Sequence, residues 1–182
     1  KNGMRASYLQ FDLAGGGDHR HAHSRHLSDI QEIIRNSKLS DQVKDTSQRV
    51  FLRLAEAEAK VHGSSIDQVH FHEVGAVDSI LDICGVMVGL VYFQIDKIFS
   101  SPLPVGGGTV QTSHGLLPVP APATLELMKM CSAPTMSSLA QVEQVTPTGM
   151  AILAEFAQFS RPEMYIQQVG VGAGTLELPW AN

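Results

Sequence analysis

Apolar residues recur at helical spacing in the first third of the chain. Ile30, Ile33 and Ile34 follow Ser28, which predicts a short helix capped by that serine. A second apolar stripe predicts a longer helix that starts near Ser40 and is ended by Gly63; its members are Val43, Val50, Leu54, Ala57 and Val61. The two helices together predict a helical hairpin packed on an apolar surface.

The rest of the chain alternates between extended and helical patterns. We expect strands over 4–13, 69–73, 95–100 and 164–169. We expect further helices over 76–92, 122–130 and 149–159. This order predicts a mixed α/β (α+β) fold, in which the helical hairpin packs on a small mixed sheet.

Proline and glycine dominate one internal region. Five of the nine prolines lie between Pro102 and Pro122, together with the run Gly106-Gly107-Gly108. Prolines are excluded from the interior of helices and central strands, so we predict a long Pro/Gly-rich loop region, of the kind that often carries function. For the domains, we expect a strand and a His-rich arm or linker over 1–27, and a single α/β domain over 28–182.

Composition excludes some classes of partner. Hydrophobic residues make up 43% of the chain, which is enough to bury a core, and the net charge is −5. An acidic chain without a basic cluster has no electrostatic reason to bind nucleic acid or an anionic membrane. No apolar run reaches the ~20 residues that span a bilayer, and no leader-like pattern opens the chain. We therefore expect a cytoplasmic protein.

The densest chemistry lies in the segment VHFHEVGAVDSILDICG, residues 69–85. On a strand, His70 and His72 leave the same face, and on the following helix Asp78 and Asp82 share a face that Gly85 and Gly89 continue. The helix is otherwise apolar, so we expect it to be buried, where unpaired carboxylates are costly. The pattern predicts a site for nickel, zinc or manganese, with these candidate ligands: His70, His72, Glu73, Asp78 and Asp82.

A bland interpretation of the same residues stays open. Asp78 could cap the helix, Asp82 could accept hydrogen bonds from a loop, and the histidines could face solvent on an edge strand.

Further imidazoles lie in the arm that precedes the first helix. His19, His21, His23 and His26 can gather a borderline metal ion, so we predict accessory metal capture there. A solvated linker without a role is the alternative.

His114 and the glycines before it form a third candidate. Gly106-Gly107-Gly108 could offer backbone N–H groups to an anion, although the spacing matches no phosphate-binding motif. His114 could be a ligand or proton donor, or a local hydrogen-bonding residue. Glu143 precedes a helix start at Thr146-Pro147, and most such starts are structural.

Taken together, these blocks resemble the LarC-type nickel insertion proteins. The resemblance rests on VHFHEVGAVDSILDICG, SPLPVGGGTVQTSHGLLPVPAPATLELM and EQVTPTGMAIL, supported by RHLSDIQEII, LAEAEAKVHG and the terminal VGVGAG. It covers nearly the whole chain in the expected order. Family members also carry an N-terminal Gly/Ser-rich segment and a C-terminal domain that this chain lacks, so the resemblance implies a central piece that need not be active alone.

The resemblance implies an activity. LarC-type proteins insert nickel into pyridinium-3,5-bisthiocarboxylic acid mononucleotide and make the nickel-pincer nucleotide cofactor of lactate racemase-type enzymes. This implies a nickel chelatase or cyclometallase of the lyase class, which uses CTP with manganese or magnesium in the full-length protein. Implied partners are the pyridinium mononucleotide, an apo-enzyme of the lactate racemase type that accepts the product and, as an open option, further copies of the chain.

Residue by residue, the resemblance implies site roles for His70, His72, Glu73, Asp78, Asp82 and His114, with Glu143 less firmly implied. A base must remove the ring proton as the nickel–carbon bond forms, and Glu73 is our first candidate and His114 our second. Two rival functions stay open. One is a non-enzymatic module that binds and delivers nickel, and the other is a metal-dependent hydrolase built on paired carboxylates.

Overall fold

The computed structural model describes residues 5–11, 25–71 and 77–174. His19, His21, His23, His72 and Glu73 lie outside the described residues, so the predictions made on them stay predictions. The chain divides into two units. The larger covers residues 19–161, and the smaller joins residues 1–18 to residues 162–182.

The predicted helical hairpin is confirmed. Helix α1 spans Leu27–Asn36 and helix α2 spans Asp41–His62. The hydroxyl of Ser40 accepts a hydrogen bond from the Val43 amide at 3.4 Å, and Gly63 ends α2 in the left-handed region at φ 63°. The first helix begins earlier than expected, because His26, not Ser28, occupies the cap position.

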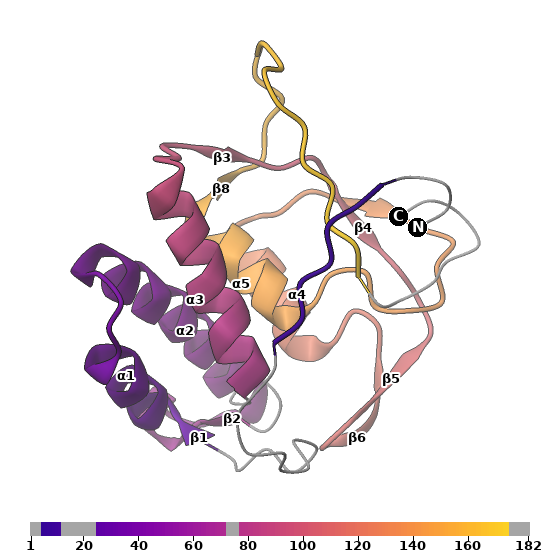
Figure 1. Ribbon diagram of the computed structural model, residues 1–182. Coiled ribbons are helices and arrows are strands. Elements are labelled where there is room, and N and C mark those ends of the chain that lie inside the picture. Colours follow the sequence, from indigo (N-terminus) through magenta and orange to yellow (C-terminus); the bar gives the residue numbers. More distant parts are fainter. Residues whose placement is uncertain (1–4, 12–24, 72–76, 175–182) are drawn as a thin grey trace. The chain divides into compact units, whose positions relative to one another are not determined.

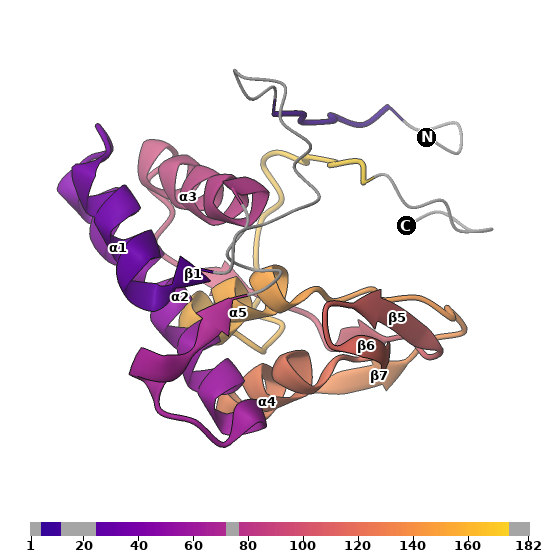
Figure 2. The ribbon, with the colours of Figure 1, turned by 90° about the horizontal axis from the view of Figure 1, so that it is seen from below.

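Helix α2 is the centre of the larger unit. It packs against α1, α3 (Val77–Tyr92), α4 (Pro122–Met130) and α5 (Pro147–Phe156), as Figures 1 and 2 show. Phe51 and Leu54 of α2 are fully buried, and Ile30, Ile83, Leu127 and Met150 reach them from the surrounding helices. Each such side chain contributes about 1.5–3 kcal/mol through burial, so this contact region holds most of the unit's stability.

Ion pairs also fasten α5 to α2. Glu155 accepts hydrogen bonds from Arg49 Nε and Arg53 Nε, both at 2.7 Å, and its side chain is only 8% exposed. The hydrogen bond to Glu155 raises the pKa of Arg53, which keeps the guanidinium charged. Charge-assisted hydrogen bonds of this kind are stronger than neutral ones, which makes the α2–α5 contact polar as well as apolar.

The mixed α/β class is confirmed, but the described residues form separate two-stranded pairs in place of one small sheet. Antiparallel pairs join β1 (Arg25–His26) to β2 (His70–Phe71), and β5 (Thr109–Thr112) to β6 (Gly115–Pro118). Parallel pairs join β3 (Ile98–Phe99) to β8 (Ala157–Gln158), and β4 (Leu103–Val105) to β7 (Thr135–Ser137). A 3-10 turn, η1 (Ile66–Gln68), connects α2 to β2.

Two consequences correct the sequence predictions. The strands predicted on either side of α3 do not share a sheet, because β2 pairs with β1 and β3 pairs with β8. The Pro/Gly-rich region contains strands as well as loops, and Pro104 lies within β4. A proline fits there because a two-stranded pair has only edge strands.

The glycine run owes its composition to a close backbone contact. A Cβ atom at Gly106 would overlap the carbonyl oxygen of Val142, and one at Gly108 would lie 2.8 Å from the carbonyl oxygen of Gln141. The Gly107 amide donates to the carbonyl oxygen of Ala140 at 2.8 Å. These glycines therefore let two chain segments meet, and the central amide is already used within the fold.

The expectation that α3 is buried is wrong for one of its faces. Ile80, Ile83, Cys84 and Met87 are buried against the core, whereas Asp78, Asp82, Gly85 and Val86 are exposed. A Cβ atom built at Gly85 or Gly89 would meet nothing within 4 Å. Helix α3 is therefore apolar in composition but has one buried face and one exposed face. No helix among the described residues is long and apolar enough to cross a membrane.

The smaller unit has little regular structure among its described residues. Ser7 forms a parallel bridge with Gly172, with hydrogen bonds of 2.9 Å from the Ser7 amide to Val171 and 2.8 Å from the Ala173 amide to Ser7. The strand predicted over 164–169 is not formed.

Candidate functional site

Two predicted metal-binding histidines meet at the junction of β1 and β2. The antiparallel register places His26 directly opposite His70, and their ring centroids lie 3.9 Å apart with the planes inclined at 49°. His26 is half-buried and His70 is exposed. The fold thus brings a residue of the predicted capture arm next to a residue of the predicted metal site; we call them the His26–His70 pair.

Hydrogen bonds fix the first ring of this pair. Nδ1 of His26 lies 3.2 Å from the carbonyl oxygen of Val69, which can only accept, so Nδ1 is the donor; in the neutral imidazole this leaves the lone pair on Nε2. The His26 amide donates to the Asp29 carboxylate at 2.8 Å, which holds the backbone at the start of α1. A carbonyl-bound imidazole with its second nitrogen basic is the usual form of a metal-ligating histidine.

The predicted carboxylates lie one turn apart at the beginning of α3. Asp78 is the second residue of α3 and accepts a hydrogen bond from the Ser79 amide at 2.8 Å, so it lies within the first turn and is not the cap of the helix. Partial burial of the Asp82 carboxyl group raises its pKa, and the neighbouring charge of Asp78 raises it further. Two like charges on one helix face attract a cation, although this alone does not define a site.

The described part of the predicted site is incomplete. Among the residues that the structure describes, no three His, Cys, Asp or Glu side chains gather closely enough to hold a metal ion. His70, Asp78 and Asp82 therefore do not form a ligand set by themselves, and the contribution of His72 and Glu73 stays a prediction.

His114 belongs to a second pair of histidines. It lies in the turn between β5 and β6, where its amide donates to the Thr112 hydroxyl at 3.1 Å. Its ring centroid lies 4.9 Å from that of His62, the last residue of α2. Nε2 of His62 lies 3.4 Å from a carboxylate oxygen of Glu58, one helical turn earlier. We call these two imidazoles the His62–His114 pair.

Sequence reasoning missed His62 and Glu58 as site residues. Their spacing of four residues on a helix was visible as a local ion-pair signal. The approach of a hairpin 52 residues further along the chain left no trace in the sequence pattern, so nothing pointed to a joint site.

A hollow of about 200 Å³ opens beside the His62–His114 pair. Glu58 and Thr112 join the two imidazoles in its polar lining, and the remaining lining is apolar, supplied by the last turn of α2, the hairpin, and the starts of α4 and α5. His114, a predicted proton acceptor, therefore lines a cavity.

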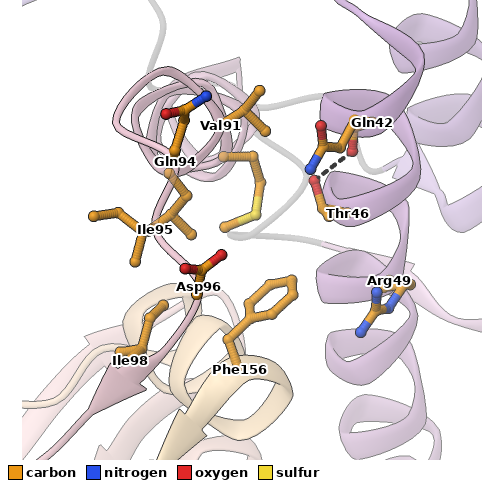
Figure 3. A pocket seen from close by; sticks show the side chains of 11 residues that line it. Gln42, Thr46, Arg49, Val91, Gln94, Ile95, Asp96, Ile98 and Phe156 are labelled. Atoms are coloured by element: carbon orange, nitrogen blue, oxygen red, sulfur yellow. Dashed lines mark hydrogen bonds between the residues drawn. The ribbon is translucent and has the colours of Figure 1, made fainter.

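A larger hollow of about 660 Å³ lies between α2, α3 and α5 (Figure 3). Gln42, Thr46 and Arg49 line it from α2, and Asp96 and Phe156 face them. The Arg49 guanidinium lies 5.2 Å from the centre of the Phe156 ring, so this wall is already stabilised by a cation–π contact. No predicted site residue reaches this hollow.

The remaining candidates have structural explanations. Thr146 caps α5 by accepting a hydrogen bond from the Gly149 amide at 3.2 Å, and Glu143 is half-buried three residues before it. Both cysteines are free, and burial raises the pKa of the Cys84 and Cys131 thiols. Neutral thiols are poor nucleophiles and poor ligands, which leaves the imidazoles and carboxylates as the candidate groups.

Comparison with known proteins defines the class. The family model described as "Nickel insertion protein" matches residues 1–182. The chain belongs to the nickel insertion protein family.

Named relatives make the assignment more specific. The chain is 47% identical over 186 residues to the pyridinium-3,5-bisthiocarboxylic acid mononucleotide nickel insertion protein of Desulfitobacterium hafniense, covering 100% of this chain and 44% of that protein. It is 49% identical over 161 residues to the protein of the same name from Clostridium kluyveri, covering 85% of this chain and 39% of that protein. The chain thus spans less than half the length of these curated relatives, and no solved structure matches it.

Proposed function

We propose that this chain supplies nickel-binding and proton-accepting groups for insertion of nickel into pyridinium-3,5-bisthiocarboxylic acid mononucleotide. The relatives carry this activity in their names, and the family match extends over the whole chain. The observation that carries the proposal is the His26–His70 pair, which brings together two imidazoles 44 residues apart in the sequence.

The pair is suited to a borderline divalent ion. Nε2 of His26 is left basic by the bond from Nδ1 to Val69, and the ring of His70 lies beside it. Imidazole nitrogen binds nickel well, and two ligands leave most of the coordination sphere open. Substrate sulfur atoms would enter those open positions. The other proposed ligands are His72, Glu73, Asp78 and Asp82.

A proton must leave the substrate ring during insertion. The ring C–H bond breaks, its electron pair forms the nickel–carbon bond, and the proton passes to a base within hydrogen-bond reach. Glu73 remains our first candidate for that base. His114 is the second, and its position beside a cavity supports it.

The remaining requirements of the reaction are proposed with it. We propose dependence on CTP with manganese or magnesium, a lyase-class nickel chelatase reaction in the cytoplasm, and transfer of the product to an apo-enzyme of the lactate racemase type. Assembly into a homo-oligomer is also proposed. These properties are proposals for this chain, since it spans under half the length of the relatives that carry the name.

The decisive experiment has two readouts. X-ray absorption of the nickel-loaded chain should show imidazole ligation that weakens in His70→Ala and persists in the matched variant His114→Ala. Mass spectrometry of the pyridinium substrate, incubated with nickel, CTP and the full natural polypeptide, should show a nickel adduct that has lost the ring proton. Nickel bound without imidazole, or a substrate of unchanged mass, contradicts the proposal.

A delivery module is the second candidate function. The described residues offer only pairs of candidate ligands, and two imidazoles release an ion more readily than a complete set. Under this alternative the nickel-loaded chain, with no chelator present, would transfer its ion to an acceptor protein. The pyridinium substrate would keep its ring proton.

A further inference from the structure

The hollow beside the His62–His114 pair has the form of a ring-binding slot. It is built by segments far apart in sequence: the last turn of α2, the β5–β6 hairpin, and the first turns of α4 and α5. Val61, Leu117, Ala123 and Pro147 give it apolar walls. Small and rigid side chains of this kind pack well against the faces of a flat ring.

The polar part of the slot's lining consists of His62, His114, Glu58 and Thr112. His62 lies close to both His114 and Glu58. Nε2 of His62 lies 3.4 Å from a carboxylate oxygen of Glu58, one helical turn earlier, which orients the His62 ring. The Thr112 hydroxyl donates to the carbonyl oxygen of Gly115 at 2.9 Å and accepts from the His114 amide, which fixes the turn that presents His114.

The size of the slot limits its occupant. Pockets that enclose a whole drug-sized ligand measure about 300–1,000 Å³, and this one measures about 200 Å³. It therefore suits a single ring, while any sugar and phosphate attached to that ring remain outside. A flat heteroaromatic ring fits both parts of the slot, because its faces are apolar and its edge bears polar or proton-bearing atoms.

We propose that this slot binds the pyridinium ring of the mononucleotide substrate and sets the reacting ring edge against the His62–His114 pair. The inference rests on the proposed function for the identity of the ring. Under this inference His114, our second candidate base, replaces Glu73: it touches the ring and accepts the proton when the carbon–hydrogen bond breaks and its electron pair passes to nickel. His62 is a positioning residue, itself oriented by Glu58.

The slot and the His26–His70 pair are connected by a short piece of chain. His70 follows His62 by eight residues, through η1, which limits the separation of their Cα atoms to at most about 28 Å. The pair proposed to hold nickel and the pair beside the slot therefore lie on neighbouring segments of the same unit.

A binding experiment tests the slot without any nickel chemistry. The probe is pyridinium-3,5-dicarboxylic acid mononucleotide, the oxygen analogue of the substrate, added to the 182-residue chain in the presence of a metal chelator. Saturation-transfer NMR should show the ring protons closer to the protein than the ribose protons. Leu117→Trp fills the slot and should weaken binding at least about tenfold, whereas Asp96→Asn, in the larger hollow, should bind as the parent does.

The variants are chosen to keep the test valid. Leu117 is half-buried, and Val61→Trp offers a second way to fill the slot from an exposed helix position if Leu117→Trp does not fold. Parent-like binding in a folded slot-filling variant, or no binding by the folded parent chain, overturns the inference.

An activity arm separates this inference from the proposed function. In the full natural polypeptide, His114→Gln and His62→Gln should lower kcat more than they raise KM and should change the pH profile of insertion, while nickel affinity stays constant. Normal nickel insertion by Leu117→Trp would contradict ring binding in the slot and would not contradict the proposed function. If the parent protein binds the ring but inserts no nickel, the proposed function is contradicted and ring binding in the slot is not.

Discussion

The two histidine pairs look alike in composition and differ in their surroundings. His26 donates to a neutral backbone carbonyl and faces His70 in an open position between two short strands. Nε2 of His62 lies 3.4 Å from a carboxylate oxygen of Glu58, and its ring faces His114 beside a cavity. A carbonyl partner orients an imidazole whose second nitrogen can face a metal ion, whereas a carboxylate partner orients an imidazole that can position a neighbouring ring. The comparison teaches that two pairs of the same composition can be proposed for different roles, because the first imidazole of each pair has a different partner.

The largest effect should come from removing the first pair. In His26→Ala combined with His70→Ala, we expect nickel affinity to fall about 100-fold or more, because losing ligands costs at least as much as losing the groups that orient them. His62→Ala combined with His114→Ala should leave nickel affinity within about twofold. Calorimetric titration with nickel measures both, and an equal loss in the two double variants would abolish the distinction.

A smaller effect should come from the anchor of β2. Phe71 is 1% exposed and contacts Phe51 edge to face, with ring centroids 6.4 Å apart. Phe71→Leu should cost about 1–1.5 kcal/mol of unfolding free energy and weaken nickel binding several-fold, because it loosens the strand that holds His70. Binding of the pyridinium probe at the other pair should be unchanged. Urea unfolding and the two titrations check this; equal weakening at both pairs would show that they are not independent.

Glu58→Gln tests the second pair more gently. An ion pair four residues apart on a helix contributes about 0.3–0.5 kcal/mol, so the chain should stay folded and the insertion rate should fall about twofold. The ring nitrogen shifts of His62 should change in ¹⁵N NMR, and those of His26 should not. Unchanged His62 signals would remove Glu58 from the arrangement.

The smallest effect concerns the acidic face that neither pair uses. The pKa of Asp82 is raised in the folded chain, so the folded state holds that proton more tightly and loses stability as pH rises from about 3.9 through the raised pKa. Without metal, Asp82→Asn should therefore gain up to about 0.5 kcal/mol at pH 7 and gain nothing below pH ~3. Thermal melts at both pH values, with chelator present, measure this. A loss at pH 7 would show that the ionised carboxylate is stabilised by a partner.

Local signals made most of the helices predictable. Ser40 and Gly63 carry the start and stop of α2 in their own chemistry, and the helix predicted over 122–130 matches α4 because Pro122 fits a first turn. The strands were harder, since a two-residue strand carries almost no periodic signal and its partner is set by tertiary packing. The separate strand pairs could not be read from alternation alone.

The candidate site divides in the same way. The spacing of Asp78 and Asp82 correctly placed both on one helix face, while their exposure contradicted a burial inferred from composition. The meeting of His26 with His70 depends on a pairing between distant segments, and the meeting of His62 with His114 depends on a hairpin folding back on a helix end. Neither follows from residue order, because contacts between distant segments are decided by the whole core.

His26 serves two structures at once. Its amide is bonded to Asp29 at the first turn of α1, and its ring stands against His70. Metal binding to the His26 ring should therefore slow hydrogen–deuterium exchange in the first turn of α1, which lies many bonds away from the ion. Nickel loading thus acquires a backbone reporter that needs no label and no substrate.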